Sequence, residues 1–230
     1  RFRAGFDFLR LRANVGEIDA ELATWWETFS LADEAAREEI YVDVSRGAVL
    51  SRDYLLMVAL ATVVAAIGLS TGQVAVVIGA MVIAPLLGPI IAFAFGTALG
   101  NRKLLWIAAK SFGVGLAVSL LSGGLLGMIL PPGLDAGLVT FEHPLGLTTA
   151  ALPLASGAAA ALMVTQNNNS ALVGVMVAAA LLPPLAAIGL LVGGGEYAQA
   201  VRALATVVAN VVAITLAAQV VFILKGIRPR

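Results

Sequence analysis

The side chains with which enzymes do chemistry are scarce in this sequence. Its 230 residues include one histidine and no cysteine, and no H-E-x-x-H, P-loop or G-x-S-x-G pattern occurs. Without cysteine, thiolate nucleophiles, disulfides and cysteine-based zinc sites are excluded. His143 stands beside Glu142 and near Asp135, but a lone loop histidine is more often solvated than bound to metal. We therefore expect no enzymatic activity, no metal and no cofactor.

Prolines are the residues that could create a site in the apolar part of the chain. Pro85 and Pro89, with Gly88 between them, lie near the middle of one apolar run, and Pro183 and Pro184 lie near the middle of another. Each proline lacks a backbone N–H and clashes with the preceding turn, so it frees carbonyl groups that lipid cannot satisfy. The prolines predict either two broken helices that line a site or two kinks packed against other helices.

Uncharged polar side chains are the other candidates for binding a solute. Those near the prolines are Ser70, Thr71, Thr165, Asn167, Asn168, Ser170 and Asn210. The asparagine-rich turn is either a solvated loop or a loop that dips inward to bind solute. An asparagine within a span, such as Asn210, joins helices by hydrogen bonding more often than it binds substrate. No Asp or Glu lies inside an apolar run, which disfavours a carboxylate-based proton relay.

The elements that must position these residues are apolar helices. Hydrophobic residues make up 60% of the chain and charged residues 12%, with a mean hydropathy of +0.97. A soluble domain has about 45–50% apolar residues and about 25% charged residues. A span takes about 20 residues, and the apolar runs are 54–69, 73–99, 104–130, 149–164, 171–192 and 200–224. We predict an all-α, polytopic membrane helical bundle of six spans, in which the short run 149–164 is either a span or re-entrant.

The charges divide the chain into two parts. Eleven of the 14 acids and seven of the 14 bases precede Tyr54, so we predict an amphipathic cytoplasmic helical segment, 1–53, and a transmembrane domain, 54–230. Apolar residues recur every three or four positions from Phe8 to Phe29, as in an amphipathic helix. That helix either lies on the membrane surface or joins subunits, or it packs on its own neighbours. We expect a homo-oligomer, because small residues in the spans also allow close helix approach.

Basic residues predict the orientation in the membrane. Those of the short loops fall on one side of the six runs, namely Arg46 and Arg52, Arg102 and Lys103, and Lys225, Arg228 and Arg230, while Arg202, near the outer end of the last run, is the exception. Short loops rich in Lys and Arg stay in the cytoplasm, so both termini are predicted to be cytoplasmic. No cleavable signal is visible before the first run. The net charge of zero argues against a nucleic-acid partner, which requires a basic excess.

An internal repeat relates two halves of the apolar part. A shift of 95 residues places 79–92 on 174–187, with eight of 14 positions identical, including matched Gly, Met and Pro. Biased composition is the alternative explanation, because Ala, Leu and Val match by chance in an apolar chain. The repeat predicts two halves of three spans, about 54–130 and 149–225. An odd number of spans per half makes this 3+3 repeat inverted, with proline-broken second and fifth spans.

Four segments resemble a known family. They are LSRDYLL at 50–56, VIGAMVIAPLLGP at 77–89, SALVGV at 170–175 and ALLPPL at 180–185. They are similar to prokaryotic hydrophobic-domain proteins of domain-of-unknown-function family 389, over about residues 40–225. The resemblance implies a multi-pass protein of a bacterial or archaeal inner membrane, often with a cytosolic domain ahead of the spans, and no agreed activity. The chain departs from the family pattern at Asn101, where we expect an acid, and in the asparagine run 167–169.

Two functions from different classes follow from these patterns. The first is a transporter or channel for a small polar or anionic solute, with a passage lined by the two broken helices. Helix N-termini carry about half a positive charge, which favours anions where acids are absent. The second is a non-transporting membrane scaffold or sensor that acts through its N-terminal cytoplasmic segment.

Overall fold

The computed structural model of the chain describes residue 12 and residues 38–130, 147–166 and 171–227. The chain divides into two compact units, Arg1–Asp43 and Val44–Arg230, and the account below concerns the second. The expected amphipathic helix from Phe8 to Phe29 falls almost wholly outside the described residues. So do Asn167, Asn168 and Ser170.

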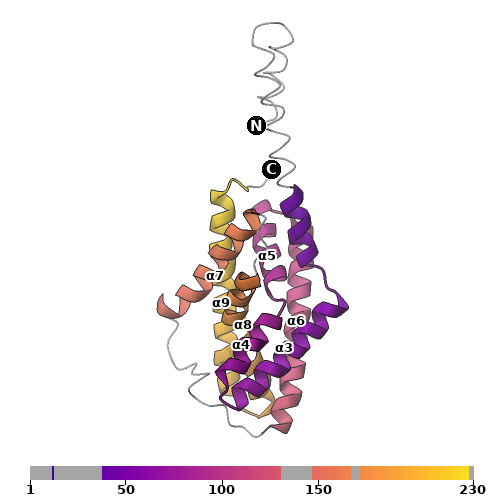
Figure 1. The fold of residues 1–230 in the computed structure, drawn as a ribbon, viewed down its shortest axis with the longest axis vertical. Coiled ribbons are helices and arrows are strands. Elements are labelled where there is room, and N and C mark those ends of the chain that lie inside the picture. The colour runs from indigo at the N-terminus through magenta and orange to yellow at the C-terminus, as the bar shows by residue number, and fades with distance from the viewer. Residues whose placement is uncertain (1–11, 13–37, 131–146, 167–170, 228–230) are drawn as a thin grey trace. The chain divides into compact units, whose positions relative to one another are not determined.

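Helices occupy all six predicted apolar runs, and the run 73–99 is divided between two of them. The helices of the second unit are α3 (Arg52–Ser70), α4 (Val74–Ile83), α5 (Leu87–Leu99), α6 (Arg102–Ile129), α7 (Leu147–Thr165), α8 (Ala171–Gly193) and α9 (Tyr197–Leu224), shown in Figure 1. The described residues contain helices and turns but no strand. The all-α prediction is therefore confirmed for this part of the chain.

Length and composition decide which of these helices could cross a membrane. Four described helices qualify, namely α3, α6, α8 from Val173, and α9, and the bent pair α4 and α5 makes a fifth if it counts as one span. Helix α7 contains only a shorter apolar stretch, Ala150–Thr165. These helices support a membrane protein with four or five spans, while a sixth span depends on α7.

Polar residues fix where two of the helices begin. The Ser51 hydroxyl accepts a hydrogen bond from the Tyr54 N–H at 3.0 Å, at the start of α3. Asn101 Oδ1 accepts from the N–H groups of Lys103 and Leu104, each at 3.1 Å, at the start of α6. Because aspartate caps helices as well as asparagine does, the expected acid would cap α6 in the same way as Asn101.

Helix α8 lies at the centre of the bundle. It packs against α3, α4, α6, α7 and α9, and Figure 1 shows it among them. The share of the apolar stretch that is buried inside the protein is 72% for α8, whereas it is 44% for α3, 28% for α9 and 22% for α6. The proline pair of α8 is therefore held inside protein.

Glycines allow α6 and α8 to approach each other at their backbones. A Cβ on Gly189 would lie only 2.8 Å from the Gly123 Cα, and a Cβ on Gly193 only 2.9 Å from the Gly127 Cα. Gly123 and Gly127 on α6, like Gly189 and Gly193 on α8, are four residues apart, the interval that places two residues on one face of a helix. These small residues are thus used for packing within the chain.

Hydroxyl groups join α3 to α6. The Tyr54 hydroxyl donates a hydrogen bond to the Ser111 carbonyl at 3.2 Å, and the Thr62 and Ser119 hydroxyls are in contact at 2.9 Å. All four side chains are buried. A buried hydroxyl without a partner is costly, so these pairs favour one register between the two helices.

Candidate functional site

The candidate site begins at the break between α4 and α5. Helix α4 ends at Ile83, α5 begins at Leu87, and their axes differ by 57°. Pro85 lies between them and disfavours the helical conformation of the residue before it. Ala84 is accordingly extended, with φ −70° and ψ 116°. Ala84 and Leu86 are 7% and 2% exposed and Pro85 is half-buried, so most of this segment faces protein.

Pro89 and Gly88 have different roles from Pro85. Pro89 is in the first turn of α5, where a backbone N–H would have no helical partner in any case. A Cβ on Gly88 would collide with the carbonyl oxygen of Gly47 and lie 2.8 Å from its carbonyl carbon. Gly88 therefore lets the break sit directly against the backbone at Gly47.

The prediction of a proline-broken fifth span is wrong. Helix α8 runs from Ala171 to Gly193 with Pro183 and Pro184 inside it. Pro184 removes the N–H that would bond the carbonyl of Ala180, four residues earlier. Asn210 Nδ2, from α9, donates to that oxygen at 2.7 Å. A neighbouring helix thus supplies the donor that Pro184 removes, and α8 is helical across both prolines.

The predicted hydroxyl candidates bond to their own helices. Ser70 Oγ and Thr71 Oγ1 donate to the Ile67 carbonyl at 3.0 and 2.7 Å, at the end of α3. Thr165 Oγ1 donates to the Leu162 carbonyl at 2.8 Å, at the end of α7. In the described residues these three side chains therefore satisfy helix carbonyls.

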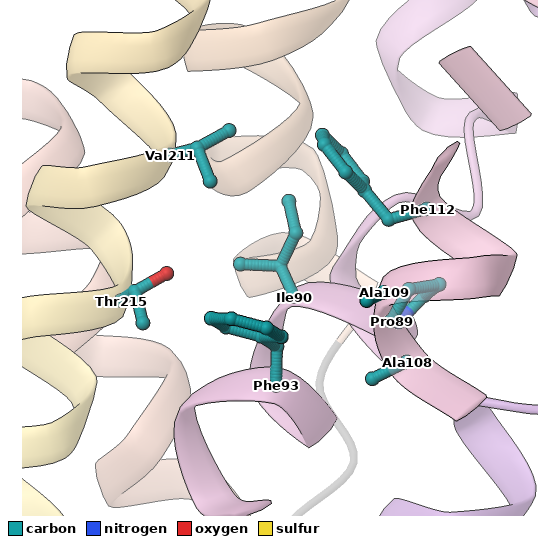
Figure 2. Close-up of a pocket in the computed structure, with 8 residues that line it drawn as sticks. All are labelled: Pro89, Ile90, Phe93, Ala108, Ala109, Phe112, Val211 and Thr215. Carbon is teal, nitrogen blue, oxygen red and sulfur yellow. The ribbon is translucent and has the colours of Figure 1, made fainter. Parts of the chain in front are cut away.

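A cavity of about 150 Å³ adjoins the first turn of α5. Figure 2 shows the side chains that line it from three helices, Pro89, Ile90 and Phe93 of α5, Ala108, Ala109 and Phe112 of α6, and Val211 and Thr215 of α9. Of these, sequence reasoning identified only Pro89. The others are hard to find in the sequence because the three helices are apolar on most faces, so periodicity does not mark an inner side.

Metal-ligating side chains do not gather in the described part of the chain. No group of three or more His, Cys, Asp or Glu residues there could hold a metal ion. Asp135, Glu142 and His143 lie outside the described residues. The site consists of backbone groups, apolar side chains and a few hydroxyl and amide groups.

A family model described as a domain of unknown function, DUF389, matches residues 81–216, more than half of the chain. The chain belongs to the DUF389 family. An uncharacterised protein of Methanocaldococcus jannaschii is 38% identical over 193 residues, which are 84% of this chain and 60% of that relative. The family resemblance is thus confirmed, and the chain covers less than two thirds of the relative's length. No solved structure matches this chain.

The DUF389 match runs from α4 to α9. It therefore includes the break at Pro85, the proline pair of α8, Asn210 and the cavity. A second model, described as the arginine-rich C-terminus of polymerase A, matches residues 1–52, less than a quarter of the chain. That segment carries more acids than bases, whereas nucleic-acid binding requires a basic excess.

Proposed function

We propose that this DUF389 protein moves a small polar or anionic solute across the cell membrane, past the break between α4 and α5. The observation that carries the proposal is the break in the helix at Ala84, Pro85 and Leu86 within apolar helices, where Ala84 and Leu86 are buried and Pro85 is half-buried. At membrane depth such backbone is tolerated only where protein covers it or where it lines a water-filled cavity. Many transporters bind solute at helices interrupted in this way.

The charge at the break favours an anion. Helix α5 starts inside the break, its N-cap residue Leu86 makes no side-chain capping bond, and no acid lies in its first turn. The free N–H groups of a helix N-terminus carry about half a positive charge. An anion or the negative end of a polar solute would stabilise them, whereas a cation would be repelled.

The passage would lie between two halves related by an inverted 3+3 repeat, with α7 as the fourth of six spans. Two contacts within the halves support the repeat. Thr62 of α3 contacts Ser119 of α6. A shift of 95 residues turns this pair into Gly157 of α7 and Ile214 of α9, where a Cβ on the glycine would lie 2.8 Å from the Ile214 Cα.

Two contacts between the halves are related in the same way. A Cβ on Gly127 of α6 would lie 2.9 Å from the Leu190 Cα of α8. The same shift relates Gly127 to Phe222 and Leu190 to Phe95, whose rings meet edge to face at 5.2 Å. A two-fold relation between halves requires such an exchange of partners, which biased composition alone does not produce.

The repeat also shows how the two halves differ. Pro89 corresponds to Pro184, but Pro85, which lies in the break, corresponds to Ala180, inside α8. Pro89 is in the first turn of α5, where its missing N–H removes no helical hydrogen bond. The half with a proline at position 85 is therefore the half with the break.

The setting of the proposal is a prokaryotic inner membrane, with both termini in the cytoplasm and the protein assembled as a homo-oligomer. The one-sided Lys and Arg distribution supports this orientation. The apolar residues exposed on α3, α6 and α9 suit contact with lipid or with other subunits. A nucleic-acid partner is not part of the proposal.

Flux into proteoliposomes tests the function. Purified protein would be reconstituted and its uptake of inorganic anions and small carboxylates compared with that of empty liposomes. We expect saturable uptake of at least one anion. Pro85→Ala, which restores a backbone N–H at the break, should lower this uptake at least about tenfold because α4 and α5 could join.

Gly79→Ala is the matched control, because a Cβ at Gly79 meets nothing within 4 Å. This variant should transport like the unchanged protein. Absence of flux for every anion, with helical content preserved, would overturn the proposal and favour a scaffold or sensor.

A further inference from the structure

Thr215 differs from the other threonines of the described chain. Those whose side chains are described each donate a hydrogen bond to a carbonyl three or four residues earlier, namely Thr62, Thr71, Thr97, Thr165 and Thr206. Thr215 is 9% exposed, and its Oγ1 is buried without a hydrogen-bond partner. A buried hydroxyl left in this state is destabilising.

The Thr215 hydroxyl is directed into the cavity between α5, α6 and α9. Figure 2 shows its oxygen turned toward Ile90 and Phe93 across the cavity. The other lining side chains are hydrocarbon. The cavity is therefore a partly open apolar pocket with one polar side-chain group on its wall.

Water does not suit this pocket. A buried water needs two to four polar partners, and the lining side chains provide one. An apolar cavity of about this volume holds a molecule the size of benzene. The occupant that matches both facts has roughly six heavy atoms, a hydrocarbon body and one oxygen that can pair with Thr215.

A lipid acyl chain does not provide the oxygen that would pair with Thr215. Thr215 lies about ten residues before the end of α9, or about 15 Å along the helix, which is near the middle of a hydrocarbon core about 30 Å thick. Acyl chains carry no oxygen at that depth. Ala109 lines the cavity and is exposed, so a small molecule dissolved in the bilayer can reach it.

We propose that this cavity is a binding site for a small, largely apolar molecule with a single hydroxyl or carbonyl group. Seven lining residues enclose its hydrocarbon part, and Thr215 hydrogen bonds to its oxygen. The site does not depend on the proposed transport. A bound molecule would touch Pro89 and Ile90, in the first turn of α5 after the break.

The test uses 4-fluorophenol and 4-fluorotoluene as probes of nearly equal shape, the first with a hydroxyl and the second with a methyl group in its place. Their binding to the full chain in lipid nanodiscs would be followed by fluorine NMR, with protein-free nanodiscs correcting for partition into lipid. We expect saturable binding of both, with 4-fluorophenol about fivefold tighter because of one hydrogen bond.

Three variants separate the explanations. Thr215→Val keeps the shape and removes the hydroxyl, so the preference for 4-fluorophenol should fall to about one. Ala109→Leu should fill the cavity and weaken both probes at least about tenfold. Thr206→Val, on the same helix but bonded to the Arg202 carbonyl, should change neither affinity.

Two results would overturn the proposal. One is an unchanged preference for 4-fluorophenol in Thr215→Val. The other is the absence of saturable binding in nanodiscs, including the case in which the probes bind in detergent only, because acyl chains would then occupy the cavity.

Discussion

Asn210 on α9 donates a hydrogen bond to the carbonyl oxygen of Ala180 on α8 at 2.7 Å. This oxygen is the one whose helical partner Pro184 removes. This amide thereby satisfies the carbonyl that Pro184 leaves unpaired, and it joins α8 to α9. The bond replaces a missing backbone contact, which explains an asparagine near the middle of an apolar helix.

The relation between Asn210 and Pro184 predicts a dependence that a double-mutant cycle can measure. Asn210→Ala should lower the free energy of unfolding by about 1–2 kcal/mol, because it leaves the Ala180 carbonyl unpaired. In a Pro184→Ala background the same change should cost less than about 0.5 kcal/mol, because the restored N–H bonds that carbonyl. SDS titration followed by circular dichroism would give the values. Equal costs in both backgrounds would contradict the assignment.

Two glycines near the break should respond in opposite ways to alanine. Gly88→Ala should destabilise the protein by about 1–3 kcal/mol, because its Cβ would collide with the backbone of Gly47. Gly79→Ala should be neutral or stabilising by up to about 1 kcal/mol, because alanine favours the helix and its Cβ meets open space. Thermal unfolding in one detergent would compare them. A tolerated Gly88→Ala would show that the break does not need this close approach.

The contact between α6 and α8 predicts a second pair of glycine variants. Gly189→Ala should lower the free energy of unfolding by about 1–3 kcal/mol, because its Cβ would lie 2.8 Å from the Gly123 Cα. Gly113→Ala, on α6 with nothing within 4 Å of its Cβ, is the control. Unfolding in SDS would measure both. If the two variants lose stability equally, helix propensity rather than packing controls this interface.

The proposed topology predicts which turns face the cytoplasm. Because the chain has no cysteine, single cysteines can be introduced and labelled with an impermeant maleimide. Glu196→Cys, in the exposed turn before α9, should react in intact spheroplasts. Lys103→Cys, exposed at the start of α6, should react only after lysis. The reverse pattern would place the termini outside.

Much of the fold is a local property of the sequence. Five of the six apolar runs became one helix each and the run 73–99 became two, because hydropathy over about 20 residues and the absence of polar interruptions act within one segment. The helix starts at Ser51 and Asn101 are local too, since a capping side chain bonds to the N–H groups two or three residues later. The family could likewise be inferred from short segments, two of which contain the prolines.

The fate of the two proline segments was decided by the tertiary structure. By itself the sequence presents Pro89 and Pro184 as equivalent positions of a repeat, and we predicted a break at both. The structure places the break at Pro85, whose counterpart Ala180 lies inside α8 and keeps its backbone N–H, whereas the carbonyl that Pro184 leaves unpaired accepts from Asn210 of α9. The cavity at Thr215 likewise forms only when three apolar helices pack. A proline frees a carbonyl locally, but only a neighbour brought close by folding can supply its hydrogen bond.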